Sequence, residues 1–253
     1  MDREAAANRI AMMREVYDFI DQKTTSFVDT EENLAKQIEE RTGIEKKYAG
    51  KSFAILCIAA TIALLIPICI VSALLSVHLY PATPFIAVLG AFLYKRNYEK
   101  KKMPDLLKTI NKSITLTENE RNDLMNLINQ AYFNVNAELQ ALLRETDDEK
   151  FIEKLDQEGI PPECGNLVAL DYMYCAVKKG YAESFPDALV HFNELKESLK
   201  SREDEKSQKL SEEIAAGELR AEYREGLIKH CKRLSEELNP VEGKTREGIQ
   251  NVV

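Results

Sequence analysis

The strongest constraint on this chain is an apolar segment from Ser52 to Tyr94 that contains no Asp, Glu, Lys or Arg. A single helix of this length would extend about 65 Å, because an α-helix rises about 1.5 Å per residue. The hydrocarbon core of a bilayer is only about 30 Å thick. The segment therefore predicts a transmembrane hairpin of two helical passes at residues 52–94.

Two prolines, Pro81 and Pro84, favour the turn of this hairpin, because proline lacks an amide donor and interrupts helices. The second pass, from Phe85 to Tyr94, is shorter than the roughly 20 residues that a full crossing needs. Two alternatives therefore stay open for it. Either it begins near Leu74 and is kinked at the prolines, or it is a shallow re-entrant segment.

Basic residues border the apolar segment on both sides, and neither Lys nor Arg occurs between its two passes. Because Lys and Arg concentrate on the cytoplasmic side of membrane proteins, we expect a multi-pass protein of the inner (cytoplasmic) membrane with both termini cytoplasmic. Near anionic lipid headgroups such cations contribute about 1 kcal/mol each. The predicted headgroup contacts are Lys46, Lys47, Lys51, Lys95, Arg96, Lys100, Lys101 and Lys102.

Small and aromatic residues suggest how the segment sits in a bilayer. Small residues one helical turn apart let transmembrane helices approach closely, either within one hairpin or between copies. The candidates are Ala59, Ala63, Ala87, Gly90 and Ala91. The alternative is that alanine is simply common in membrane spans. Tyrosines collect at the headgroup level, where we expect Tyr80 and Tyr94.

The tails on either side of the hairpin predict an all-α protein. Apolar residues recur there at helical spacing, and short breaks divide the chain into segments. We predict N-terminal cytoplasmic helices at 1–51, a coiled-coil-like helix at 95–145, a helical-hairpin module at 146–199, a charged helix at 200–239 and a disordered tail at 240–253. The stripe at 95–145 has nearly the 3.5-residue period of a coiled coil. Its predicted packing residues are Leu124, Ile128, Val135, Leu139 and Leu142.

Capping signals predict where the helices begin. Capping boxes at Asp29 and Thr117 predict two helix starts, and Pro104 suits the first turn of another helix. In the module, Asn166 and Ser184 precede two apolar stripes that are separated by Gly180. The last of these helices could continue from Pro186 to about Leu238, with the stretch from Lys200 to Lys209, which has no apolar residue, either a solvated helix or frayed.

The module contains Gly159-Ile160-Pro161-Pro162, then Ala169, Gly180-Tyr181-Ala182-Glu183-Ser184 and Ala188-Leu189. With these residues it resembles a module found in uncharacterised membrane-anchored coiled-coil proteins of Gram-positive-type bacteria. The resemblance covers about 40 residues, and the family's usual Arg-Ala-Asp-Thr after the glycine is replaced here. It implies this architecture and a bacterial envelope setting, and it implies no reaction.

No enzyme motif occurs in the sequence, and we expect no enzyme, cofactor or metal site. There is no Gly-x-x-x-x-Gly-Lys phosphate loop and no Cys-x-x-Cys pair among the five cysteines. A net charge of −8 argues against nucleic acid as a partner, since binders of nucleic acid are usually basic.

Two functions fit this pattern. The first is a membrane-anchored structural or adaptor protein that presents helical, coiled-coil surfaces to itself or to another membrane or cytoplasmic protein. The second is a small membrane-active or transport-accessory protein whose hairpin oligomerises. Both make the lipid bilayer a partner, and they differ in whether the apolar segment or the tails carry the function.

Overall fold

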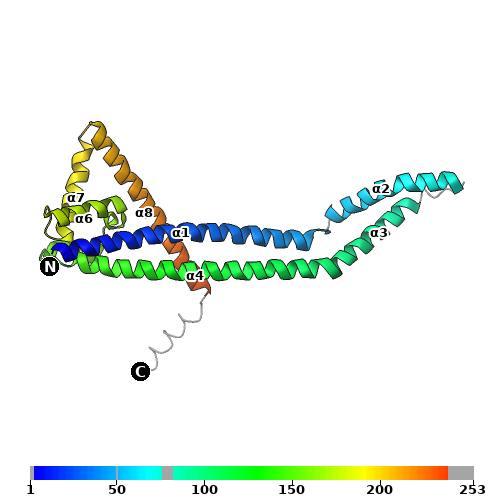
Figure 1. The fold of residues 1–253 in the computed structure, drawn as a ribbon, viewed down its shortest axis with the longest axis horizontal. Coiled ribbons are helices and arrows are strands. Elements are labelled where there is room, and N and C mark those ends of the chain that lie inside the picture. Colours follow the sequence, from blue (N-terminus) through cyan, green and yellow to red (C-terminus); the bar gives the residue numbers. More distant parts are fainter. Residues whose placement is uncertain (1–2, 50, 76–81, 239–253) are drawn as a thin grey trace, which may run out of the picture. The chain divides into compact units, whose positions relative to one another are not determined.

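The computed structural model describes residues 3–49, 51–75 and 82–238, and it is all-helical over those residues (Figure 1). The chain forms two compact units. Unit 1 comprises Met1–Asp29 with Arg121–Val253, and unit 2 comprises Thr30–Glu120. The elements are α1 (Arg3–Lys46), α2 (Lys51–Leu75), α3 (Thr83–Asn97), the π-helical turn η2 (Tyr98–Lys102), α4 (Met103–Leu143), α5 (Glu149–Glu158), the 3-10 turn η3 (Pro162–Gly165), α6 (Leu167–Lys179), α7 (Phe185–Lys200) and α8 (Glu205–Leu238).

Helix α1 runs without a break through the predicted cap at Asp29, so the expectation of two separate helices was wrong. Just before Asp29, hydroxyl side chains form hydrogen bonds with backbone carbonyls of the same helix. Thr24 and Thr25 both donate to the carbonyl of Asp21, at 2.9 and 3.0 Å. Phe27 is buried in the core of unit 1, so tertiary packing keeps this stretch helical despite the cap signal.

Helix α4 begins at Met103, so Pro104 lies in its first turn as predicted, but the helix start predicted at Thr117 was wrong. The chain is helical from α3 through η2 into α4, and the Met103 amide bonds to the carbonyl of Tyr98 five residues earlier. A proline ring clashes with the carbonyl four residues before it, and the wider π turn relieves that clash at Pro104. Thr117 lies inside α4, where its hydroxyl donates to the carbonyl of Ser113.

Unit 1 has a contiguous core to which six helices contribute, α1, α4, α5, α6, α7 and α8. Its largest buried side chains come from α1, α4, α6 and α7, and α8 adds Ile214, Ile228 and Cys231. The stripe predicted on α4 lies inside this core: Ile128, Val135, Leu139 and Leu142 are buried, and Leu124 is half-buried against them. These side chains therefore pack on the chain's own helices, such as α1.

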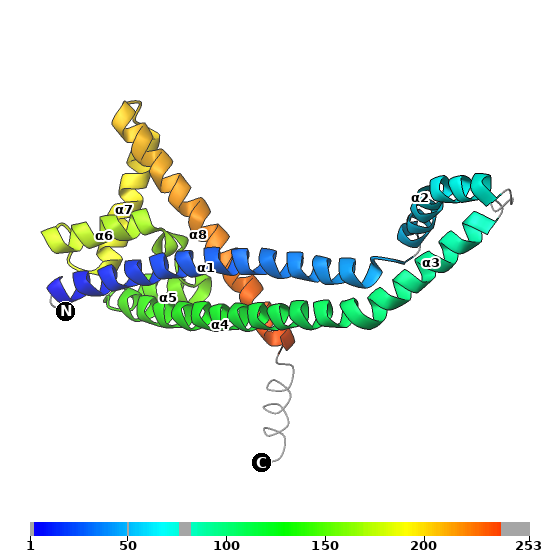
Figure 2. The ribbon, with the colours of Figure 1, turned by 45° about the vertical axis from the view of Figure 1, so that its right-hand side comes forward.

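The predicted caps of the module are confirmed. Asn166 accepts a hydrogen bond from the Val168 amide at 2.9 Å, and Ser184 accepts one from Asp187 at 3.3 Å. Between the two helices, Gly180 has φ of +76°, the left-handed conformation that glycine adopts without steric cost. Helices α6 and α7 pack against each other as a helical hairpin (Figure 2).

The chain breaks after Lys200 and α8 begins at Glu205, so α7 does not continue to Leu238 and the charged helix is a separate element. Asp204 caps the new helix by accepting from the amide and hydroxyl of Ser207, at 3.0 and 2.7 Å. The turn lets α8 pack back on α6, α7 and η3. A straight continuation of α7 would have left that apolar surface uncovered.

Unit 2 is a helix pair joined to the apolar segment. The later part of α1 runs beside the earlier part of α4, and Leu34 packs there with Ile110 and Ile114 (Figures 1 and 2). Helices α2 and α3 pack side by side. Among the described residues, one helix, Ser52–Ile70, is long and apolar enough to cross a membrane. Much of the predicted turn, including Tyr80 and Pro81, lies outside the described residues, as does the predicted disordered tail at 240–253.

Candidate functional site

The first candidate site is the outer surface of α2. None of the side chains between Ser52 and Ile70 is buried, although the segment is strongly apolar. Ile66, for example, is 70% exposed. The exposed isoleucines and leucine of this helix are Ile55, Ile58, Ile62, Leu65, Ile66 and Ile70. An apolar surface this continuous marks a site of contact with a membrane or another apolar surface.

The small residues singled out in the sequence fall in two environments. On α3, Ala87 and Ala91 are buried and, with Thr83, form a line of small side chains one turn apart. Ala59, Ala63 and Gly90 are exposed. Open space surrounds Gly90, since an added Cβ there would meet no atom within 4 Å. The structure thus places two of the five small residues on the packed side of the hairpin.

Aromatic and cationic side chains gather where α1 ends and η2 begins. The Lys47 amine lies 5.8 Å from the ring centre of Tyr48 and 5.4 Å from that of Tyr98. The Tyr48 ring meets the edges of Tyr94 and Tyr98, at 5.7 and 5.0 Å between centroids. Cations over aromatic faces are attracted by the ring quadrupole. Sequence reasoning named Tyr94 and missed Tyr48 and Tyr98, whose signal was their position beside basic residues.

The predicted headgroup residues surround this cluster, and we call those with described side chains the basic collar. All but Lys95 are exposed, and η2 carries three of them in succession. Lys95 is half-buried, 5.2 Å from the Phe53 ring centre and 3.6 Å from a Glu99 oxygen. The side chain of Lys51 lies outside the described residues. The basic collar comprises Lys46, Lys47, Lys95, Arg96, Lys100, Lys101 and Lys102.

The second candidate site is a cleft of about 600 Å³ within unit 1. Its walls come from five parts of the chain: α1, α4, the segment from Glu158 to Gly165, α7 and α8. Such a volume lies within the range of small-ligand sites, roughly 300–1,000 Å³. Its lining residues include Tyr17, Tyr132, Asn136, Gln140, Ile160, Pro161 and Pro162.

Arg224 on α8 is the buried cation of this cleft, with a side chain only 3% exposed. Its guanidinium donates to both carboxylate oxygens of Asp21, at 2.5 and 3.2 Å, and to the carbonyl of Gly165 at 2.9 Å. It also lies 4.5 Å from the ring centre of Tyr17. Arg224 therefore ties α8 to α1 and η3, and two-pronged contacts of this kind are the strong ones.

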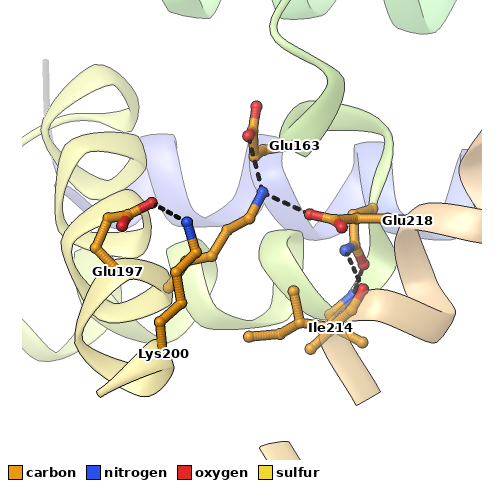
Figure 3. A network of polar contacts seen from close by, with 8 residues as sticks. Glu163, Glu197, Lys200, Ile214 and Glu218 are labelled. Atoms are coloured by element: carbon orange, nitrogen blue, oxygen red, sulfur yellow. Dashed lines mark hydrogen bonds and ion pairs between the residues drawn. The ribbon is translucent and has the colours of Figure 1, made fainter. Parts of the chain in front are cut away.

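A second cation of the cleft lining, Lys196 on α7, bridges Glu163 and Glu218, the two carboxylates labelled in Figure 3. Its amine lies 2.6 Å from Glu218 and 3.3 Å from Glu163. Hydrogen bonding to Glu218, followed by Glu163, raises the pKa of Lys196 although its partial burial opposes this. Nearby, the Asn166 amide donates to the carbonyl of Ile214 at 3.1 Å, which fixes α8 to the start of α6 (Figure 3).

The residues that line the cleft are acidic in sum. Five glutamates and two cations line it, which leaves a formal charge of −3. Both cations are already committed to carboxylate partners. The glutamates are Glu158, Glu163, Glu218, Glu222 and Glu225.

Tyr17 contributes a polar group to the cleft that the rest of unit 1 does not satisfy. Its side chain is 3% exposed, yet it lines the cleft. Within the described parts of the chain, no protein group forms a hydrogen bond with its hydroxyl. Burial raises the pKa of Tyr17, so the phenol is neutral and can both donate and accept. Burial also raises the pKa of the Cys164 thiol. Because the thiolate is the nucleophilic form of cysteine, Cys164 is not a reactive thiol.

Sequence reasoning did not foresee this cleft. Tyr17 was one apolar position of a helical stripe, and neither Asp21 nor Arg224 was singled out in the charged tails. The pair is separated by 203 positions in the sequence, and nothing local links its members. Among the described residues no cluster of His, Cys, Asp and Glu is arranged to hold a metal ion.

Comparison with known proteins identifies no relative for this arrangement. No family model, curated protein or solved structure matches the chain.

Proposed function

We propose that this chain is a membrane-anchored adaptor: the α2–α3 hairpin holds it in a bilayer, and unit 1 holds a partner beside the membrane. The observation that carries the proposal is the outer surface of α2. Isoleucines that are 62–70% exposed on a protein surface, such as Ile55, Ile62 and Ile66, are unfavourable in water. A bilayer covers such a surface, at about 25 cal/mol per Å² of apolar area removed from water.

The basic collar supports the same proposal. Its cations lie at the end of the apolar hairpin together with three tyrosines, as expected at the boundary between lipid and water. Headgroup phosphates there would meet the exposed amines of η2. We propose two passes with both termini in the cytoplasm, because both ends of the hairpin carry these cations. The bacterial envelope setting remains a proposal that rests on the resemblance of the module.

The apolar stripe of α4, which the sequence suggested as a coiled-coil surface for a partner, is not available for that role. The α4 stripe is buried in unit 1, so deleting residues 117–144 would destroy the core and could not test partner binding. The acidic cleft is open and charged. It is therefore the surface of unit 1 that we assign to the partner.

Alkaline extraction of native membranes tests the anchor. We expect the chain to stay in the membrane pellet at high pH, because lipid contacts of α2 do not depend on charge. Release into the supernatant would contradict the proposal. A membrane-impermeant reagent added from outside should label neither a cysteine placed near Arg3 nor one placed near Leu238, and labelling of either would contradict the two-pass topology.

Vesicle leakage separates the adaptor from the membrane-active alternative. Purified chain reconstituted into dye-loaded vesicles should release no dye above the level of empty vesicles, because an adaptor's hairpin encloses no water. Leakage that rises with protein concentration would favour an oligomeric pore.

A further inference from the structure

We propose that the acidic cleft of unit 1 binds a basic peptide segment by receiving one of its Arg or Lys side chains against Tyr17 and the surrounding glutamates. This inference rests on the proposed adaptor function, since it names the chemistry of the partner. Its first support is the charge of the lining. Five glutamates line the cleft against two cations, Arg224 and Lys196, and both cations are paired. Glu158 and Glu225 pair with the exposed Lys154 and Lys229, at 3.7 and 2.9 Å, but exposed pairs of this kind are weak, so the acidic lining favours a cation from outside.

The second support is the hydroxyl of Tyr17. The side chain of Tyr17 is 3% exposed, but its hydroxyl is not one of the fully buried, unpaired atoms of the described residues, so it borders the open cleft. Tyr17 lines the cleft, so a ligand there can reach the hydroxyl that the described protein groups leave unsatisfied. A guanidinium or ammonium group donates N–H bonds, and the neutral phenol oxygen accepts one.

The third support is the shape and chemistry of the walls. Ile160, Pro161 and Pro162 form one side, and Tyr132 lies on α4. The methylene stem of Arg or Lys packs on such surfaces while its charged head reaches polar groups. The carboxylates Glu222 and Glu225, one turn apart on α8 within the cleft, suit that head.

Other ligand classes fit less well. The carboxylates are spread along the cleft, and no metal-holding group was found among the described residues. An anion would face five glutamates, with both cations already engaged. A basic segment gives the charge complementarity that steers protein association.

The test uses the full chain in nanodiscs of neutral phosphatidylcholine, which does not attract basic peptides. The probe is a fluorescent hexa-arginine peptide, and binding is followed by anisotropy, with hexa-glutamate as the control peptide. We expect saturable, equimolar binding of hexa-arginine alone. The double variant Glu222→Gln/Glu225→Gln should weaken it about tenfold, because each such charge contributes modestly.

Two further variants make the result specific. Tyr17→Phe removes only the hydroxyl and should weaken binding about fivefold, as expected for one hydrogen bond. Glu236→Gln/Glu237→Gln removes the same charge from exposed sites on α8 outside the cleft, and should leave binding unchanged. Circular dichroism checks folding, and if Tyr17→Phe does not fold, the Glu222/Glu225 variant decides.

Three results would overturn the inference: no saturable binding, equal weakening by both double variants, or spermine binding as tightly as the peptide with the same dependence on the variants. The last would indicate a polyamine site. Failure of the anchor is a separate outcome. Alkaline release with intact peptide binding would overturn the membrane proposal alone, and retention without peptide binding would overturn this inference alone.

Discussion

The two units treat apolar side chains in opposite ways. In unit 1, the isoleucines and leucines of α1 and α4 are covered by α6, α7 and α8, and Ile128 is fully buried. In unit 2, the same two helices share only a small core around Leu34 and Ile110, and the apolar surface of α2 stays exposed. Protein covers one set of side chains, and the proposed bilayer covers the other.

The same difference between the two units explains why a charged side chain is buried in unit 1 but none occurs in the apolar segment of unit 2. Unit 1 holds a guanidinium that is 3% exposed, because Asp21 and a backbone carbonyl compensate it. Between Ser52 and Tyr94 of unit 2 there is no charged residue, and the cations begin where the segment ends. A polar group inside unit 1 can be paired by neighbouring helices, while α2 offers few such partners along its outer surface.

The largest expected effect comes from placing lysine on each kind of surface. Ile128→Lys buries a charge in the core, so unit 1 should lose at least about 3 kcal/mol of unfolding free energy or fail to fold, while membrane retention persists. The double variant Ile62→Lys/Ile66→Lys should release the chain from the membrane and leave the folding of unit 1 unchanged. Each lysine costs about 3 kcal/mol in a membrane span, and neither side chain lies in a protein core.

Alkaline extraction and the thermal unfolding of unit 1 by circular dichroism measure both effects on the same preparations. The comparison would break if Ile62→Lys/Ile66→Lys unfolded unit 1, or if Ile128→Lys left it intact.

The next effect concerns the buried ion pair of unit 1. Arg224→Ala leaves Asp21 and the Gly165 carbonyl without their donor, and we expect a loss of about 3–5 kcal/mol in unfolding free energy. Denaturant titration of the chain in neutral detergent measures it. Arg220→Ala, an exposed arginine one turn earlier, is the control and should change stability by less than about 0.5 kcal/mol. Equal losses in both variants would show that the pairing of Arg224 is not what matters.

Two glycines of α8 are expected to give smaller changes in stability, of opposite sign, when each is replaced by alanine. A Cβ on Gly217 would come within 2.2 Å of the Asn166 side-chain oxygen, so Gly217→Ala displaces the residue that caps α6 and contacts Ile214. We expect a loss of about 1–3 kcal/mol. Gly226 has open space around it, and Gly226→Ala should stabilise the helix by up to about 1 kcal/mol. Thermal unfolding midpoints should therefore move in opposite directions, and shifts of one sign would contradict the packing of α8 on α6.

The smallest expected effect is the loss of the helix cap at Asp204, compared with Asp29, which has the sequence of a cap but lies inside α1. Hydrogen bonds from the Ser207 hydroxyl and amide lower the pKa of Asp204. A lowered pKa in the folded state means that the stabilisation is present above the ordinary pKa of 3.8 and is lost as the pH falls through the folded-state pKa. Asp204→Ala should therefore lower the unfolding midpoint slightly near neutral pH, and this difference should vanish in acid.

Asp29→Ala is the matched control, because Asp29 is exposed in the middle of α1. It should have no comparable effect. A similar, pH-dependent loss in Asp29→Ala would show that the continuous α1 is wrong and that the predicted cap exists.

Local sequence predicted most of the helical segments and some of their ends. The caps at Asn166 and Ser184 and the glycine at Gly180 were confirmed, because each acts through hydrogen bonds or backbone conformation within a few residues. The cap signals at Asp29 and Thr117 failed. There the buried faces of α1 and α4 continue past the signal, and packing outweighs a contribution of about 1 kcal/mol from a cap.

The sequence by itself determined that the chain is helical and that its one charge-free segment needs an apolar environment, because periodicity and transfer free energy act residue by residue. Only the tertiary structure decided that the α4 stripe is an internal core and that α7 and α8 turn back on each other. It alone brought Tyr17 and Asp21 into contact with Arg224. Contacts between residues more than 200 positions apart depend on how the helices pack, and packing leaves no signal in the local sequence.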